Sequence, residues 1–212
     1  MHTLLIVDVQ NDFCPGGELA ITDGDTVIDP INAISPYFNN IILTQDWHTP
    51  NHSSFASQHD DKNEYDTIEL DYGTQVLWPD HCVQGSIGAE FHHKLDTTRS
   101  TLVIRKGFRT AIDSYSAFFE NDKTTRTGLT GYLKELGVKT LFMTGLATDF
   151  CVKYSAIDAI KEGFEVYIVE DACRGIDLNN SVDTAIKEMK LVGVKFTDSK
   201  HVKNYITKLN GL

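Results

Sequence analysis

Short apolar runs recur along the chain and alternate with segments of mixed polarity. The runs are rich in valine, isoleucine and leucine, and they occupy residues 3–9, 40–46, 101–106, 140–145, 165–171 and 192–197. Runs that are apolar almost throughout are typical of strands covered on both faces, as in a parallel sheet between helices. The pattern therefore predicts about six strands in one mostly parallel sheet.

Helical spacing of apolar residues occurs between these runs. It is clearest in residues 127–137 and 149–163, and each of these stretches ends at a glycine suited to a C-cap. Strands that alternate with helices build an α/β fold. The sequence thus predicts a three-layer sandwich with a central, mostly parallel sheet and helices on both faces.

The length of the chain fits one domain. Its 212 residues, 41% of them hydrophobic, are enough for one α/β domain with a substantial core and few for two. We therefore expect a single domain over residues 1–212. Residues 47–100 are rich in His, Asp, Ser and Gly and lack long periodicity. Long irregular insertions in compact domains are usually functional, so we expect a metal-binding or lid insertion there.

Charge excludes some classes of partner. The formal net charge is -11, and no run of lysine and arginine occurs, so the protein repels phosphate backbones and anionic lipid. We expect no nucleic-acid or membrane partner, whereas a homo-oligomer is compatible with the sequence. The apolar stretch before Asp8 is too short for a signal peptide or a membrane span, which predicts a cytoplasmic protein.

Reactive side chains stand at the ends of four predicted strands. Asp8, Asp46 and Lys106 end the first three runs, and Cys151 lies just beyond the fourth. Ligands of open parallel sheets bind outside the carboxyl ends of the strands, so topology alone brings these residues together. An aspartate at a strand end often only caps the next helix. A lysine that ends a buried run, however, needs an acidic partner or a function.

Cys151 has two interpretations. If Thr148 or Asp149 caps the following helix, the thiol lies in its first turn, where the helix dipole lowers the pKa of a thiol. Backbone N–H groups of Ala147 and Cys151 could then hold the oxyanion of a tetrahedral intermediate. Alternatively, the residue is a small buried hydrophobe. The remaining cysteines, Cys14, Cys82 and Cys173, are interpreted in that second way.

A second group of side chains has the chemistry of a metal site. Asp46 is followed by His48 and His52 in "QDWHTPNH", and His81 follows in "WPDHC". Carboxylate and imidazole together suit one divalent ion such as Zn, Fe or Mn, and three protein ligands leave positions open for water or substrate. We expect Asp46, His48 and His81 as ligands and His52 as a further candidate.

Several sequence blocks together point to a known family. They are "IVDVQNDFCPGG", "TQDWHTPNHSSF", "WPDHCVQGS", "RKGF" with "DSYSAFF", and "GLATDFCVKYSAIDA". From about residue 4 to 177 the chain resembles the bacterial nicotinamidases, also called pyrazinamidases, among the isochorismatase-like cysteine hydrolases. The resemblance implies hydrolysis of nicotinamide to nicotinate and ammonia, a step in NAD salvage, and likewise of pyrazinamide to pyrazinoate.

The resemblance also implies roles for individual residues. Asp8, Lys106 and Cys151 would form the catalytic triad, with Asp8 taking the thiol proton and Cys151 forming a thioester. Asp46, His48 and His81 would hold the metal, which binds the ring nitrogen of the substrate; His52 would bind it directly or through water. A cis peptide bond is implied between Leu146 and Ala147. Aromatic walls around the ring would come from Phe13, Trp78 and Tyr115.

Three alternatives remain open at this point. The first is a metal hydrolase whose bound water is the nucleophile, with a structural Cys151. The second is another isochorismatase-like amidase, such as an isochorismatase or a carbamoyl amidase. The third is a metal- or nucleotide-binding module without catalysis, although no GxGxxG or Walker A pattern follows any of the runs.

Overall fold

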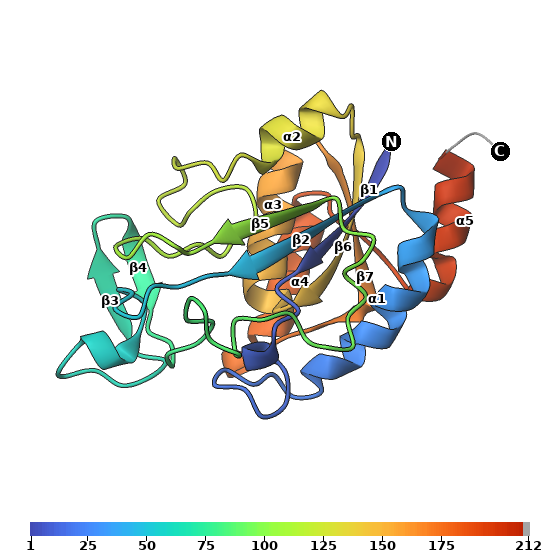
Figure 1. Ribbon diagram of the computed structural model, residues 1–212. Helices are drawn as coiled ribbons and strands as arrows, with labels where there is room; N and C mark the ends of the chain where they lie inside the picture. Colours follow the sequence, from blue (N-terminus) through green and yellow to red (C-terminus); the bar gives the residue numbers. More distant parts are fainter. Residues whose placement is uncertain (210–212) are drawn as a thin grey trace.

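A six-stranded sheet forms the centre of the computed structural model, which describes residues 1–209. Its strands are β1 (His2–Val7), β2 (Asn40–Asp46), β5 (Leu102–Lys106), β6 (Thr140–Leu146), β7 (Glu165–Arg174) and β8 (Lys195–Thr197). All neighbouring pairs are parallel, in the order β5-β2-β1-β6-β7-β8 (Figure 1). The strands coincide with or overlap the six apolar runs, so the predicted sheet is confirmed.

Helices cover both faces of this sheet. They are α1 (Ile28–Ile34), α2 (Leu129–Glu135), α3 (Lys153–Lys161), α4 (Ser181–Leu191) and α5 (Ser199–Leu209). Alternate side chains of β1 point to opposite faces: Leu4 and Ile6 pack in one core with α1 and α5, while Leu5 and Val7 pack in a second core with α2, α3 and α4. The predicted three-layer sandwich is therefore confirmed.

Short helical turns fill several of the connections. The 3₁₀ turns are Asn11–Phe13, Gly24–Val27, Ser35–Tyr37, Ala56–Gln58 and Leu178–Asn180. A π-helical turn, η5 (Thr148–Val152), joins β6 to α3. This turn carries Cys151 and is discussed with the site.

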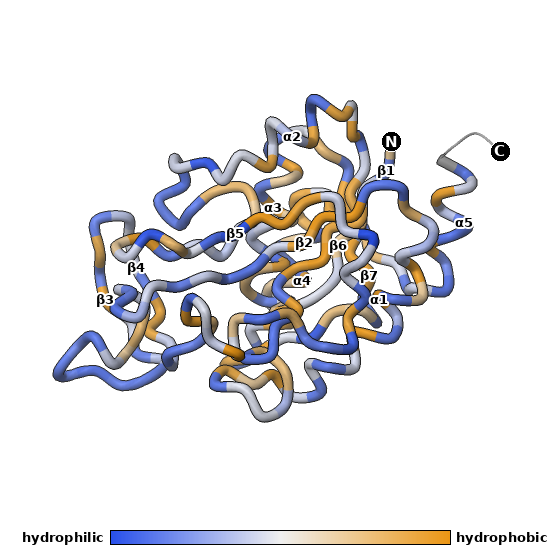
Figure 2. The backbone as a smooth tube through the Cα atoms, viewed as in Figure 1, coloured by the Kyte–Doolittle hydropathy of each residue, from blue (hydrophilic) through white to orange (hydrophobic). Residues whose placement is uncertain are grey.

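Besides the 3₁₀ turn Ala56–Gln58, the segment 47–100 contains a small hairpin. Strands β3 (Thr67–Leu70) and β4 (Gly73–Val76) form an antiparallel hairpin that projects beyond the edge of the sheet (Figure 1). The loop before it is strongly hydrophilic, whereas the central strands are apolar (Figure 2). The hairpin is too short and too polar to show as a periodic pattern in the sequence.

Residues 199–209, which carry no motif, form α5. Val202 of this helix is fully buried in the core that α5 shares with α1. In residues 1–209, no helix combines the length and the apolar character that crossing a bilayer requires.

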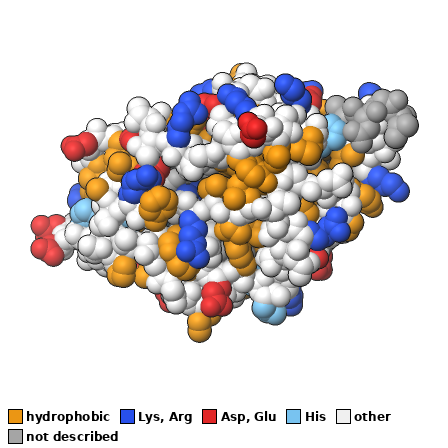
Figure 3. All heavy atoms as spheres, turned by 45° about the horizontal axis from the view of Figure 1, so that its top comes forward, with side chains coloured by type: hydrophobic (Ala, Val, Ile, Leu, Met, Phe, Trp, Pro, Cys, Tyr) orange, Lys and Arg blue, Asp and Glu red, His pale blue; other side chains and the backbone are white. Residues whose placement is uncertain are grey.

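One face of the molecule, seen in Figure 3, carries grouped apolar side chains with lysine and arginine side chains scattered around them. Exposed apolar residues of the edge strand and the loop after it include Val103 at 41% and Phe108 at 42%. Apolar surface of this kind often contacts partners. The homo-oligomer stays a prediction.

Candidate active site

Three strand ends bring Asp8, Lys106 and Cys151 into contact. Asp8 directly follows β1, Lys106 is the last residue of β5, and Cys151 lies in η5 after β6. The Lys106 Nζ lies 2.8 Å from Asp8 Oδ2 and 3.4 Å from Cys151 Sγ. All three side chains are buried. The convergence expected from topology is therefore present in the structure.

Glycine at position 145 permits this close approach of β1 and β6. Gly145 has a φ of +108°, and a Cβ there would lie 2.0 Å from the carbonyl oxygen of Val7. Asp8, the residue after Val7, itself has a φ of 47°. Its carboxylate accepts a hydrogen bond of 2.6 Å from the Thr44 hydroxyl on β2. The close approach of the β1 and β6 backbones and this hydrogen bond together fix the direction of the Asp8 side chain.

Burial and the neighbouring charges together set the pKa values of the three groups. It raises the pKa of Asp8 to about 6, although Lys106 opposes the shift. Burial also lowers the pKa of Lys106, but Asp46 and Asp8 outweigh it, so this pKa lies well above its ordinary value. Lys106 therefore stays charged between two carboxylates.

The Cys151 thiol differs from the sequence-based expectation. Burial raises the pKa of Cys151 well above its ordinary value, Lys106 lowers it, and Asp8 and Asp46 raise it further. The expected lowering is thus wrong, because desolvation and two carboxylates outweigh the nearby ammonium group. A thiol with a raised pKa is protonated at neutral pH and needs a base before it can attack.

The expected helix cap is also wrong. Neither Thr148 nor Asp149 makes a side-chain cap at the start of η5. Asp149 instead accepts hydrogen bonds from the backbone N–H groups of Ile176 and Asp177, at 3.0 and 2.9 Å. It also accepts one from the Ser181 hydroxyl, so its carboxylate holds the loop after β7 against the turn that carries Cys151.

The backbone at the start of η5 has the expected cis geometry. The peptide bond between Leu146 and Ala147 is cis, as the resemblance implies. Ala147 and Cys151 line the same cavity, which places the two expected oxyanion donors at one site.

Asp46, His48 and His81 form a compact donor group beside the thiol. One ligand atom from each lies within 4.8 Å of the other two. The carboxylate of Asp46 is shared, because its Oδ1 pairs with Lys106 while its Oδ2 lies 3.8 Å from His48 Nε2. The predicted ligands therefore meet in space.

Hydrogen bonds at Nδ1 leave the Nε2 atoms of His48 and His81 available as metal ligands. His48 Nδ1 donates to the Gly107 carbonyl at 2.9 Å, and His81 Nδ1 donates to the Pro79 carbonyl at 2.8 Å. Burial lowers the pKa of His48 to about 3 and that of His81 to about 4, so both rings are neutral. Neutral imidazoles with a backbone-bound Nδ1 are the usual form of histidine metal ligands, so the donor set fits a divalent ion.

His52 lies outside this first group. Its Nδ1 is 2.7 Å from the Ser54 hydroxyl, and its Nε2 is 3.3 Å from the Ile112 carbonyl. It instead belongs to a second group of donors with His48 and Asp113, again within 4.8 Å of one another. Asp113 was not predicted, because it ends no strand and has no histidine near it in the sequence.

A cavity of about 20 Å³ joins the thiol to the metal-ligand group. Phe13, Trp78 and Tyr115 line it as predicted, and the Trp78 Nε1 donates a hydrogen bond of 3.1 Å to the Tyr115 hydroxyl. Sequence reasoning missed further wall residues, namely Leu19, Phe150 and Ile176. Phe150 could have been found from its place beside Cys151, whereas the other two give no local signal.

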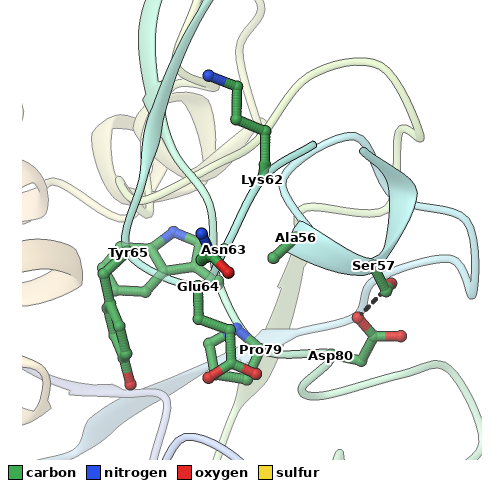
Figure 4. Close-up of a pocket in the computed structure, with 9 residues that line it drawn as sticks. Ala56, Ser57, Lys62, Asn63, Glu64, Tyr65, Pro79 and Asp80 are labelled. Carbon is green, nitrogen blue, oxygen red and sulfur yellow. Dashed lines mark hydrogen bonds between the residues drawn. The ribbon is translucent and has the colours of Figure 1, made fainter. Parts of the chain in front are cut away.

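A larger, open hollow of about 520 Å³ lies against the same tryptophan. Its lining includes Lys62, Tyr65 and Asp80, and Asp80 accepts a hydrogen bond of 2.6 Å from the Ser57 hydroxyl (Figure 4). Neither Cys151 nor the metal-ligand histidines line this hollow. Of these two cavities, only the smaller one is lined by Cys151 and the candidate metal ligands.

Comparison with known proteins places this chain in a family. The model of the isochorismatase domain matches residues 2–201. The chain belongs to the isochorismatase family. It is 53% identical to the nicotinamidase of Acinetobacter baylyi over 94% of this chain and 93% of that protein.

Solved structures of the isochorismatase family agree with this placement. The nicotinamidase/pyrazinamidase of Acinetobacter baumanii has a TM-score of 0.94 at 55% identity, covering 95% of this chain and 97% of that one. PnC1 of L. infantum in complex with nicotinate has a TM-score of 0.84 at 40% identity, covering 94% and 93%. The pyrazinamidase of Pyrococcus horikoshii in complex with zinc has a TM-score of 0.76 at 35% identity, covering 93% and 98%.

Proposed function

We propose that this member of the isochorismatase family is a nicotinamidase. It hydrolyses nicotinamide to nicotinate and ammonia, and pyrazinamide to pyrazinoate, through a thioester on Cys151. One observation carries the proposal. Asp8, Lys106 and Cys151 are in buried contact. Beside them, at a cavity with aromatic walls, lies the metal-ligand group of Asp46, His48 and His81. The 53% identity of this chain to the Acinetobacter baylyi nicotinamidase supports nicotinamide as the substrate.

Asp8 is the general base of the first step. Its ionised carboxylate takes the proton of the Cys151 thiol, and the Lys106 ammonium group, 3.4 Å from the sulfur, stabilises the resulting thiolate. The sulfur then attacks the carboxamide carbon, and the N–H groups of Ala147 and Cys151 hold the oxyanion. Asp8 returns the proton to the leaving nitrogen, ammonia departs, and water cleaves the thioester to release the acid and restore the thiol.

Asp46, His48 and His81 hold one divalent ion in this proposal, and His52 lies at its edge. When bound, an ion such as zinc, iron or manganese supplies a Lewis acid for the ring nitrogen of the substrate. Phe13, Trp78 and Tyr115 enclose the ring. Because the cavity has room for about one water molecule, the walls must move for the ring to enter.

Ammonia release from nicotinamide tests the proposal. The wild-type protein loaded with zinc should release ammonia, and a chelator should abolish it. Cys151→Ala should remove turnover, whereas Cys173→Ala, which changes another buried cysteine outside the cavity, should keep it. Substantial turnover by Cys151→Ala, with folding and metal content equal to wild type, would show that the thiol is not the nucleophile.

A further inference from the structure

Asp113 is a buried carboxylate that the proposed reaction does not use. It lies in the loop after β5, is 2% exposed, and lines the cavity that also contains Cys151. Its Oδ1 accepts a 2.7 Å hydrogen bond from the Ser114 backbone N–H, and its Oδ2 accepts one of 2.9 Å from Gln75 Nε2. Both partners are neutral, so neither balances its charge.

The charges around the cavity do not cancel. Three carboxyl groups, those of Asp8, Asp46 and Asp113, are buried at the site, and the ammonium group of Lys106 is already paired with the first two. Within residues 1–209, no lysine or arginine forms an ion pair with Asp113. Counting only these carboxylates and this ammonium group, two formal negative charges remain buried. Such charges are costly unless a cation compensates them, and one divalent ion compensates both.

Geometry places Asp113 where it can act on that ion. His48 belongs both to the donor group with Asp46 and His81 and to the group with His52 and Asp113. Asp113 thus lies next to the ion site, with His48 shared between the two groups. Separations up to 4.8 Å, without a direct hydrogen bond from either histidine, are of the size that one ion or one water spans.

We propose that Asp113 is the second carboxylate of the ion site and that its charge sets the affinity of the site for a divalent cation. The inference rests on the ion site of the proposed function and extends it to a residue outside the predicted ligands. Gln75 of the β3–β4 hairpin positions this carboxylate, since its fully buried amide donates to Asp113 Oδ2. The hairpin therefore contributes to ion affinity without contacting the ion.

Zinc affinity of charge-removing variants tests the inference. Asp113→Asn and the smaller Asp113→Ser should bind zinc about 10- to 100-fold more weakly than wild type, measured by competition with a chromophoric chelator. Asp113→Glu, which keeps the charge, should retain more affinity than either. The control is Asp158→Asn, because Asp158 is also buried but pairs with Lys161 in α3, away from the cavity. It should leave zinc affinity unchanged.

Thermal unfolding separates a charge-balancing role from a purely structural one. Without metal, Asp113→Asn should melt higher than wild type, because an uncompensated buried charge is gone. Saturating zinc should raise the melting temperature of Asp113→Asn by less than it raises that of the wild type, because the variant binds zinc more weakly. Unchanged zinc affinity in the variants, or an equal loss of melting temperature with and without zinc, would overturn the inference.

The amidase assay keeps this inference distinct from the proposed function. A wild-type protein that binds zinc through Asp113 yet releases no ammonia from nicotinamide would refute the function and support the inference. A wild-type amidase whose zinc affinity is untouched in Asp113→Asn and Asp113→Ser would refute the inference alone.

Discussion

Lys106 connects the two halves of the candidate site. Its ammonium group contacts Asp8, Asp46, the Ser114 carbonyl at 2.9 Å and the Cys151 sulfur at 3.4 Å. Burying an ammonium ion costs several kcal/mol unless opposite charges and hydrogen bonds compensate it. Two carboxylates compensate it here, so Lys106 keeps the base and a metal ligand charged within one buried cluster.

The raised pKa of Asp8 predicts the acid limb of the pH profile. Asp8 must be ionised to take the thiol proton, and burial raises its pKa to about 6, so kcat/KM should fall about tenfold per pH unit below that value. His48 and His81, with pKa values lowered to about 3 and 4, protonate only at lower pH. Zinc content measured at each pH is the control. A constant kcat/KM down to pH 5 would contradict the assignment of the base.

Replacing the base separates it from the fold. Asp8→Asn keeps the size of the side chain and should slow single-turnover acylation by about 10²–10⁴-fold, the usual contribution of a general base. Rapid-quench measurement of the thioester in one turnover reports this step. Acylation at the wild-type rate would assign the proton to another group.

Residues at strand ends could be predicted, whereas residues in loops could not. Asp8 and Lys106 each end an apolar run, so topology alone predicts their meeting. Leu19, Asp113 and Ile176 reach the cavity from loops. Their positions depend on tertiary packing, and no local pattern in the sequence records it. The thiol pKa was predicted in the wrong direction for the same reason, since desolvation follows from packing.

At the scale of elements, β6 and the turn after it do most to place the nucleophile. Asp149 holds the loop after β7 by hydrogen bonds to Ile176 and Asp177, and Ile176 in turn lines the cavity. The hairpin β3–β4 contributes Gln75 in the same indirect way. Both contacts are made by polar side chains outside the central sheet, and hydrophobic periodicity does not reveal them. Helix α5 was missed as well, because its 11 residues follow directly on β8 without a motif.

Gly145 sets the spacing between β1 and β6. Gly145→Ala would place a Cβ 2.0 Å from the Val7 carbonyl oxygen at a φ of +108°, so it should lower the free energy of unfolding by at least about 2 kcal/mol. Gly163→Ala is the matched control, because Gly163 also has a positive φ, +93°, but no atom within 4 Å of its Cβ position. Urea unfolding measures both variants. Equal losses would mean that backbone conformation alone, and not the contact with β1, requires glycine at 145.

At the scale of the whole molecule, sheet order decides which groups can meet. Strands β5, β2, β1 and β6 are neighbours in that order, and their carboxyl ends supply Lys106, Asp46, Asp8 and the turn with Cys151. The insertion 47–100 then brings His48 and His81 over the same edge. The molecule thereby places a candidate nucleophile and a metal-ligand group in the wall of one cavity. This arrangement allows the thiol to attack the carboxamide while an ion at the metal-ligand group binds the ring nitrogen.

Comparison of two amides tests that separation. Benzamide has the carboxamide of nicotinamide but no ring nitrogen, so it should be a much poorer substrate of the zinc-loaded protein. His48→Ala weakens the ion and should lower kcat/KM for nicotinamide far more than for benzamide, because only nicotinamide loses an interaction. The two substrates should converge, with a coupling of about 1–3 kcal/mol between substitution and ring nitrogen.

The same measurement distinguishes the metal-hydroxide alternative. An ion that supplied the attacking water would act on the carboxamide, which both amides share, so His48→Ala would slow both by one factor. Metal occupancy must be matched between the two series, because a difference in loading would change both rates together. Equal losses for nicotinamide and benzamide at matched occupancy would refute the orienting role of the ion. They would also revive the metal-hydroxide alternative, in which Cys151 is structural, and the comparison of Cys151→Ala with Cys173→Ala tests that role independently.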